Sequence, residues 1–171
     1  MIQMCFCLRI PYQRQSLTAQ PPHHPYGLRG MYTCCDIKRQ VVLADERDTG
    51  LRMILNFGHT VGHAFELAGH YEQWTHGQAV AVGMLWAAAL GEKLGITPAG
   101  TREEIGKVLE QYALPTHIPC PWEVMVEAVG LDKKRAGEGI SFVLLDKLGW
   151  AEPKKMETNQ LLEQLQQLYQ G

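Results

Sequence analysis

The sequence lacks the features that mark several large protein classes. Its five cysteines are odd in number, include no Cys-x-x-Cys pair, and place Cys34 beside Cys35. This spacing fits neither a disulfide framework nor a zinc ribbon, and it predicts reduced thiols. The longest apolar run covers residues 79–90. A run of this length is too short to cross a bilayer and indicates a buried helix instead.

An excess of positive charge is also missing. Sixteen Lys and Arg stand against 18 Asp and Glu, for a formal net charge of −2. The densest basic group is Lys133-Lys134-Arg135, whereas nucleic-acid binding needs a larger cluster of cations. We therefore expect neither a nucleic acid nor a membrane as partner. The 171 residues, 46% of them hydrophobic, predict a globular domain with a real core.

The chain is expected to divide near residue 30. Residues 11–30 are rich in Gln, His and Pro without helical or strand periodicity, and residues 1–30 are therefore predicted to be an irregular or disordered leader. Residues 31–171 form the predicted domain, which is mostly α and arranged as a helical bundle. Helices are expected over residues 34–44, 51–68, 76–94, 101–112, 121–131 and 158–169, with a short extended segment at 140–145. A capping box of Thr101 and Glu104 and a C-terminal cap at Gly95 set two of the ends.

Three histidines stand out in the centre of the chain. His59 and His63 are separated by four residues, so they project from one face of a helix. Thr60 follows the first of them, so the glutamate of an HExxH protease helix is absent. His76 begins the next helix after a short loop, which should bring it back beside His59. Spacing alone predicts a metal or anion site in which His59 and His63 share the ligand; the alternative is hydrogen-bonded core histidines.

Polar residues upstream extend this group. Arg52 and Asn56 precede His59 and His63 at spacings of four, three and four, which gives one stripe if the helix is unbroken. Lys38 lies further upstream. A guanidinium, an amide and imidazoles on one face suit an anionic, hydroxyl-rich ligand, although Arg52 alone is equally explained as a surface charge.

Several ordered segments together resemble a known family. They are residues 34–47, 50–52, 56–66 (NFGHTVGHAFE), 74–84 (WTHGQAVAVGM), Asp132-Lys133-Lys134, Gly139 and 142–145. In this order and spacing they resemble 3-dehydroquinate synthase, from about residue 32 to residue 149. The resemblance implies a domain of the dehydroquinate-synthase type in a cytoplasmic, homo-oligomeric enzyme of the shikimate pathway, which makes aromatic amino acids.

The resemblance also implies an activity and its cofactors. The family converts 3-deoxy-D-arabino-heptulosonate 7-phosphate to 3-dehydroquinate and phosphate, as a carbon–oxygen lyase. It uses NAD catalytically, together with a divalent metal, zinc or cobalt. NAD acts as a transient acceptor of hydride, and the metal polarises the reacting oxygen as a Lewis acid.

The family's site residues carry over to matching positions here. His59 and His76 resemble two of the three metal ligands, and His63 resembles a substrate-contacting histidine rather than a ligand. The further substrate contacts expected from the resemblance are Lys38, Arg52, Asn56, and Lys133 or Lys134. This assignment differs from the one that spacing alone suggests, in which His59 and His63 share the metal.

The sequence also departs from the family's pattern. Asp48 stands where the family usually has Glu. The third metal ligand, a Glu, and the NAD-binding α/β domain are expected upstream of the residues present here, so the chain is expected to be the C-terminal half and inactive alone. A separate NAD-domain chain is one possible source of both. The alternatives are a non-catalytic remnant, a partner-binding helical fragment, another sugar-phosphate cyclase, or a metal-dependent alcohol dehydrogenase. The upstream DNA would distinguish a truncated reading frame, in which an NAD-domain sequence continues, from a remnant.

Overall fold

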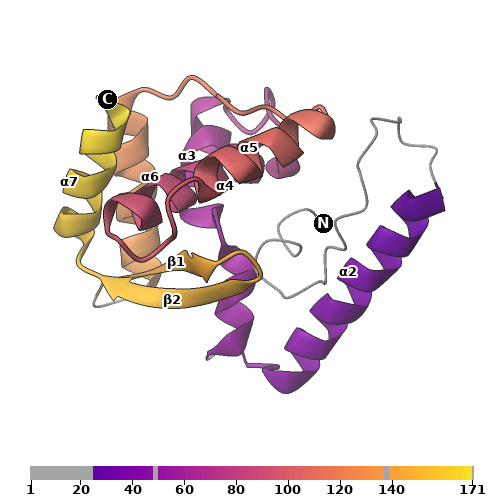
Figure 1. The fold of residues 1–171 in the computed structure, drawn as a ribbon. Coiled ribbons are helices and arrows are strands. Elements are labelled where there is room, and N and C mark those ends of the chain that lie inside the picture. Colours follow the sequence, from indigo (N-terminus) through magenta and orange to yellow (C-terminus); the bar gives the residue numbers. More distant parts are fainter. Residues whose placement is uncertain (1–24, 48–49, 137–138, 171) are drawn as a thin grey trace.

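The computed structural model describes the backbone of residues 25–47, 50–136 and 139–170, and the side chains of these ranges except 25–31, 33 and 132–136. The elements are α2 (Pro25–Ala44), the 3-10 helix η1 (Leu51–Asn56), α3 (His59–Ala68), α4 (His76–Lys93), α5 (Thr101–Gln111), α6 (Trp122–Ala136), β1 (Ile140–Lys147), β2 (Trp150–Met156) and α7 (Thr158–Tyr169). The prediction of a mostly α domain is confirmed. Helices α3 to α7 pack into one body above the hairpin that β1 and β2 form, and α2 lies beside this body (Figure 1).

Helix α4 is the centre of that body. Its residues from Ala79 to Gly91 are buried except Trp86, so the helix is apolar on all sides. It packs against α3, α5, α7 and β1. Such a helix is stable only when other elements surround it, which agrees with the expectation of a buried helix here. In the part of the chain that the structure describes, no helix is long and apolar enough to span a membrane.

The predicted continuous helix over residues 51–68 is wrong, because it breaks at Phe57 and Gly58. Gly58 has φ +81°, a left-handed conformation that L side chains rarely adopt. The break lets the start of α3 lie directly on α4. A Cβ on Gly83 would lie 2.0 Å from the carbonyl oxygen of Gly58. The glycines therefore let the two backbones touch.

The ends of the helices match the sequence only in part. Gly95 has φ +69° and follows α4, where its amide donates to Glu92 and the next amide to Gly91. This is a Schellman motif, so the predicted cap is confirmed. The capping box predicted for Thr101 is wrong: Gly100 is the N-cap, and the Thr101 hydroxyl donates to a carbonyl oxygen before the helix.

The C-terminal half adds a hairpin. The extended segment expected at 140–145 is strand β1, and β2 pairs with it antiparallel from Ile140↔Met156 to Lys147↔Trp150. Strand β2 was not predicted because its proline and charged residues hide the pattern, although an edge strand tolerates Pro153. Helix α6 ends at Ala136 rather than 131.

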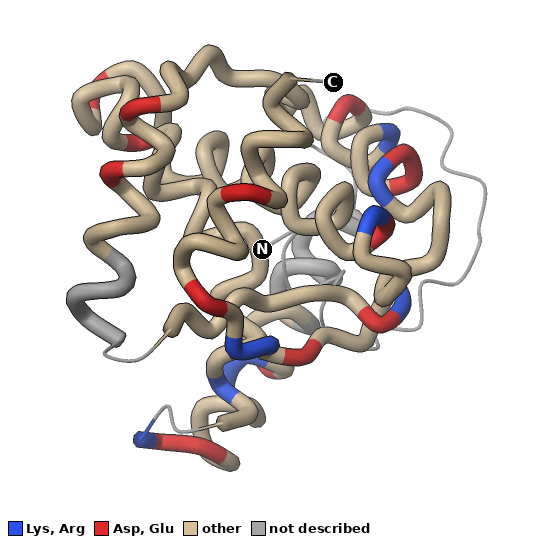
Figure 2. Tube along the Cα trace, turned by 90° about the vertical axis from the view of Figure 1, so that its left-hand side faces the viewer, with Lys and Arg blue, Asp and Glu red and all other residues tan. Residues whose placement is uncertain are grey.

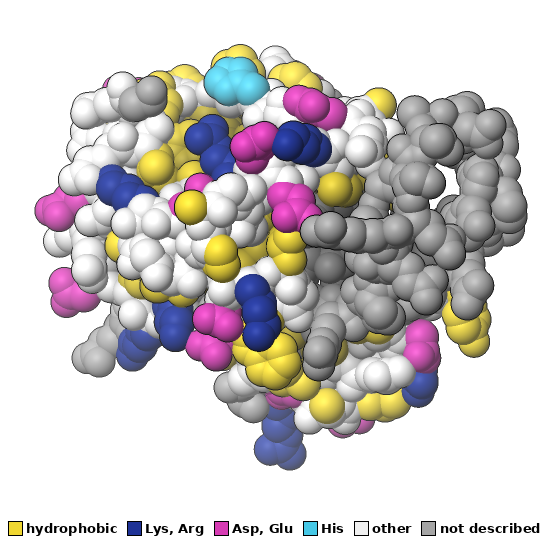
Figure 3. Space-filling model, in the orientation of Figure 1, with side chains coloured by type: hydrophobic (Ala, Val, Ile, Leu, Met, Phe, Trp, Pro, Cys, Tyr) yellow, Lys and Arg dark blue, Asp and Glu magenta, His cyan; other side chains and the backbone are white. Residues whose placement is uncertain are grey.

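The predicted leader is only partly described. Its last residues, 25–30, are the start of α2 rather than irregular chain. Residues 1–24 lie outside the described residues. Charged residues of both signs occur along the described trace (Figure 2), and charged side chains of both signs are interspersed over the face that Figure 3 shows. This distribution agrees with the charge balance of the sequence.

Candidate functional site

Three imidazoles gather where α3 begins to cross α4. His59 and His63 lie one turn apart on α3, and His76 is the first residue of α4. The ring centroids of His59 and His76 are 5.0 Å apart, and those of His59 and His63 are 5.8 Å apart. The separation between His63 and His76 is 6.5 Å. The predicted return of the second helix to His59 is therefore confirmed.

The tight helix crossing determines this proximity. Gly62 lies between the two histidines of α3, and a Cβ there would lie 3.1 Å from the Cα of Val80. Buried Val61 and Phe65 hold the opposite side of α3 in the core. The histidines consequently face the one side of α3 that the core leaves partly open.

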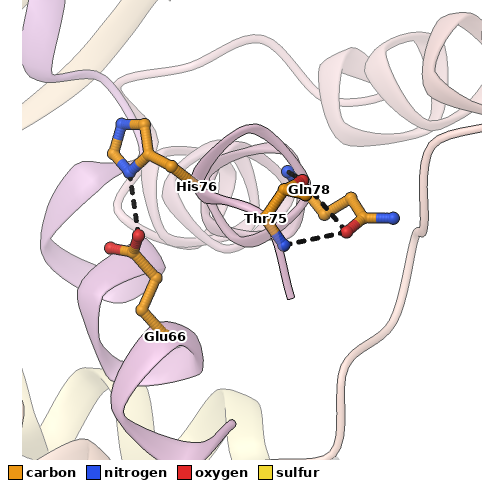
Figure 4. A network of polar contacts seen from close by, with 4 residues as sticks. All are labelled: Glu66, Thr75, His76 and Gln78. Carbon is orange, nitrogen blue, oxygen red and sulfur yellow. Dashed lines mark hydrogen bonds and ion pairs between the residues drawn. The ribbon is translucent and has the colours of Figure 1, made fainter. Parts of the chain in front are cut away.

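A hydrogen-bonded network fixes the start of α4. The Thr75 hydroxyl accepts from the amide of Gln78, while the Gln78 side chain accepts from the amide of Thr75, in a capping box. On the next residue, the Nδ1 of His76 lies 3.0 Å from a carboxylate oxygen of Glu66 on α3 (Figure 4). The network thus connects the two helices that carry the imidazoles.

The pKa of His59 lies far from the ordinary value of an imidazole. Burial lowers its pKa to about 4, and the nearby His76 and His63 charges act in the same direction. The backbone at Phe57 and the charge of Glu66 oppose the shift. His59 is therefore a neutral imidazole at pH 7, the form that ligates metals.

The ring separations can be compared with the needs of one metal ion. A zinc–nitrogen bond of about 2.0–2.1 Å places a ring centroid roughly 3.2 Å from the metal, so two tetrahedral imidazoles lie about 5 Å apart. His59 and His76, at 5.0 Å, match this value. His63 and His76, at 6.5 Å, exceed even the roughly 6.4 Å of two opposite ligands. Within the described residues, no group of three or more His, Cys, Asp or Glu is arranged to hold a metal.

The residues predicted to contact an anion lie on other elements. Lys38 is exposed on α2, whereas Arg52 and Asn56 are on η1. The single stripe predicted for Arg52 and Asn56 with the histidines does not form, because the helix breaks at Gly58. Arg52 is held locally: its amide donates to Asp45 at 3.0 Å and its guanidinium to the Glu46 carbonyl at 3.2 Å.

Two predicted substrate contacts and one departure from the family's pattern have side chains outside the described residues. The backbone of Lys133 and Lys134 belongs to α6, and their side chains lie outside the described residues. Asp48 also lies outside them. The assignment of Lys133 or Lys134 as a substrate contact stays a prediction.

Glu66 is a further candidate residue that the spacing of the histidines did not single out. It follows His59 by seven residues and His63 by three, so it lies on the same helix face. This periodicity was available in the sequence. A carboxylate near imidazoles is a common partner for a ligand histidine.

Comparison with known proteins places these features in a family. Residues 13–135 match the family described as 3-dehydroquinate synthase C-terminal, and the match begins inside the predicted leader. The 3-dehydroquinate synthase of Clostridium acetobutylicum is 45% identical over 136 residues, covering 79% of this chain and 38% of that protein. That of Streptococcus gordonii is 40% identical over 135 residues, covering 78% and 38%. The chain thus spans about two fifths of the length of these relatives.

Solved structures share the fold. A 2-deoxy-scyllo-inosose synthase complexed with carbaglucose-6-phosphate, NAD+ and Co2+ aligns with TM-score 0.79 at 21% identity, over 97% of this chain and 50% of that one. The 2-epi-5-epi-valiolone synthase of Streptomyces hygroscopicus, with NAD+ and Zn2+ bound, gives 0.73 at 19% identity, over 86% and 41%. The family match covers most of this chain, which therefore belongs to the 3-dehydroquinate synthase C-terminal family.

Proposed function

We propose that this chain is the metal- and substrate-binding part of a 3-dehydroquinate synthase. The reaction is the conversion of 3-deoxy-D-arabino-heptulosonate 7-phosphate to 3-dehydroquinate and phosphate, a cytoplasmic lyase step of the shikimate pathway. Family membership supports the reaction. The single observation that carries the site is the 5.0 Å separation of the His59 and His76 rings.

His59 and His76 would hold the divalent metal, zinc or cobalt. Both metals occur in solved structures of the same fold. When bound, the metal supplies Lewis-acid polarisation of a substrate oxygen. The burial that keeps His59 neutral at pH 7 leaves a lone pair on its ring.

His63 would contact the substrate instead of the metal. Its ring lies 5.8 Å from that of His59, on the same face of α3. A half-buried imidazole at this distance can accept or donate a proton at a substrate hydroxyl beside the metal.

Lys38, Arg52, Asn56 and one of Lys133 and Lys134 would bind the anionic groups of the substrate. Arg52 is suited to a phosphate or carboxylate because its guanidinium offers several planar donors, and it uses one on the Glu46 carbonyl. NAD is proposed because both solved neighbours contain it.

Metal affinity tests the site directly. In a competition titration of the purified chain with zinc and a chromogenic chelator, His59→Ala and His76→Ala should each weaken affinity at least tenfold. His63→Ala should change it less than threefold, and exposed His117→Ala is the matched control. Unchanged affinity in both His59→Ala and His76→Ala would overturn the metal assignment.

Turnover tests the reaction. Phosphate release from the heptulosonate phosphate would be followed with NAD and zinc present, for the chain alone and with an NAD-binding domain of the same family added. We expect release only with the added domain, and none when the chain carries His59→Ala. Metal binding without release in either condition would favour a non-catalytic helical fragment.

A further inference from the structure

We propose that Glu66 is a positioning residue for His76: its carboxylate fixes the protonated nitrogen of the ring and turns the other nitrogen toward the metal. The metal part of this inference rests on the proposed function. The part concerning the ring itself does not, because it follows from contacts within the chain.

The contact defines the state of the imidazole. A carboxylate oxygen of Glu66 lies 3.0 Å from the Nδ1 of His76. Because an ionised carboxylate can only accept a hydrogen bond, we assign the proton of the ring to Nδ1, which donates it to Glu66. In the neutral ring the lone pair then lies on Nε2. The partner of one ring nitrogen thus determines which nitrogen is available to a metal.

The two side chains differ in exposure. The Glu66 side chain is 14% exposed and that of His76 is 57% exposed. A carboxylate withdrawn from most of its water needs a donor, and the imidazole supplies one. His76 meanwhile keeps more than half of its side chain open to solvent or to a ligand. The mostly buried Glu66 side chain therefore holds the His76 side chain in place, while the His76 ring stays accessible to a metal.

Both residues are anchored through their backbones. The capping box of Thr75 and Gln78 fixes the first turn of α4, on which His76 is the first residue (Figure 4). The carbonyl of Glu66 accepts from the amide of Tyr71 at 2.8 Å, at the end of α3. The Glu66–His76 contact therefore joins two ordered helix ends.

The loop between them is also constrained. Tyr71 and its neighbour His70 have positive φ values of 60° and 53°, which non-glycine residues adopt at a cost. A Cβ on Gly69 would lie 2.6 Å from the Trp74 ring, so the loop packs closely on itself. This fixed connection limits how far the His76 ring can move away from Glu66.

The first test needs no metal. Long-range proton–nitrogen NMR of the chain at about pH 8, where ordinary imidazoles are neutral, reports which ring nitrogen is protonated. We expect Nδ1–H for His76 in the wild type. In Glu66→Ala the ring should change to Nε2–H or to a mixture. An Nε2–H ring in the wild type, or an unchanged ring in Glu66→Ala, would overturn the proposal.

The second test measures metal affinity. Cobalt titration of Glu66→Ala should give affinity weakened by about 10–100-fold, with a changed visible spectrum. Glu66→Gln, which keeps an acceptor oxygen but loses the charge, should lie between wild type and Glu66→Ala. The control is Glu103→Ala, which removes an exposed glutamate paired with Lys107 on α5. Thermal unfolding of each variant verifies the fold.

A double-mutant cycle distinguishes positioning from a general structural effect. In a His76→Ala background, Glu66→Ala should change cobalt affinity by less than twofold, because the ring on which it acts is gone. An equal loss in both backgrounds would overturn the positioning role. If wild type and His76→Ala bind cobalt equally, the proposed metal function fails, while the NMR result still decides the role of Glu66 toward the ring.

Discussion

The pair of helices α3 and α4 and the segment formed by α2 and η1 both carry candidate site residues, but they are held in different ways. In α3 and α4 the histidines are fixed by buried side chains and by glycines that let the backbones touch. By contrast, most described side chains of α2 are exposed. The connection from α2 to η1 is held by polar contacts, in which the Asp45 carboxylate accepts from the amides of Gly50 and Arg52.

The difference separates two tasks of a metal- and anion-binding site. Ligands of a metal need positions accurate to a fraction of an ångström, and a packed helix crossing supplies them. Residues that bind a charged group through long side chains need less accuracy, because a flexible stem such as that of Lys lets the charge adjust to its ligand. We therefore expect core changes to damage the imidazole cluster and surface changes on α2 to leave it intact.

The largest expected effect is at the crossing itself. In Gly83→Ala the new Cβ would lie 2.0 Å from the Gly58 oxygen and 2.8 Å from the Gly62 nitrogen, all in backbone that cannot rotate away. The helices must separate, so we expect the free energy of unfolding to fall by about 3 kcal/mol or more. Urea denaturation measures the change.

Gly130→Ala is the matched control for this substitution. Gly130 also lies inside a helix, but a Cβ there meets no atom within 4 Å. Alanine at this position should raise stability by about 0.5–1 kcal/mol through helix propensity. Equal effects of the two substitutions would contradict the role of the close crossing.

A smaller effect is expected from the burial of His59. Its pKa is about 4 in the folded chain, against the ordinary value of 6.5 expected in the unfolded chain, so below pH 6.5 the unfolded chain binds more protons. Stability is therefore retained above about pH 6.5 and lost as the pH falls toward 4. Allowing for its partial exposure, we expect a loss of about 1–2 kcal/mol between pH 7 and pH 5.

Urea denaturation at both pH values, for wild type and His59→Gln, isolates this contribution. The glutamine variant cannot titrate at that position, so its stability should depend less on pH. If the free energy of unfolding depended on pH equally in the two proteins, His59 would not be buried as the structure describes.

The same contrast explains what the sequence could predict. Periodicity located α4 and its glycine cap because the helix is apolar and its end is a local signal. The return of His76 to His59 was also predictable, since a short loop between helices leaves few alternatives. These features depend on residues close together in the chain.

The most consequential missed feature depends on a neighbour that is distant in the sequence. The break at Gly58 exists because α4 approaches there, and Gly83 lies 25 positions away in the sequence. An amphipathic pattern that continues from η1 into α3 conceals such a break. Strand β2 was missed for a different reason: its proline and charged residues hide the strand pattern, although its partner β1 is adjacent in the chain. The predicted stripe of Arg52, Asn56, His59 and His63 was wrong because of the break at Gly58.

The smallest expected effect is on α2. Asp36 forms an ion pair with Arg39 at 2.8 Å and accepts from Gln40 at 2.7 Å, and these contacts lower the pKa of its carboxyl. All three side chains lie near solvent, where such pairs contribute little because water and salt screen them. We expect Asp36→Ala to leave the thermal unfolding midpoint and the cobalt affinity within experimental error. A clear fall in cobalt affinity, with the midpoint unchanged, would show that α2 takes part in the imidazole site, and the separation between the two regions would have to be abandoned.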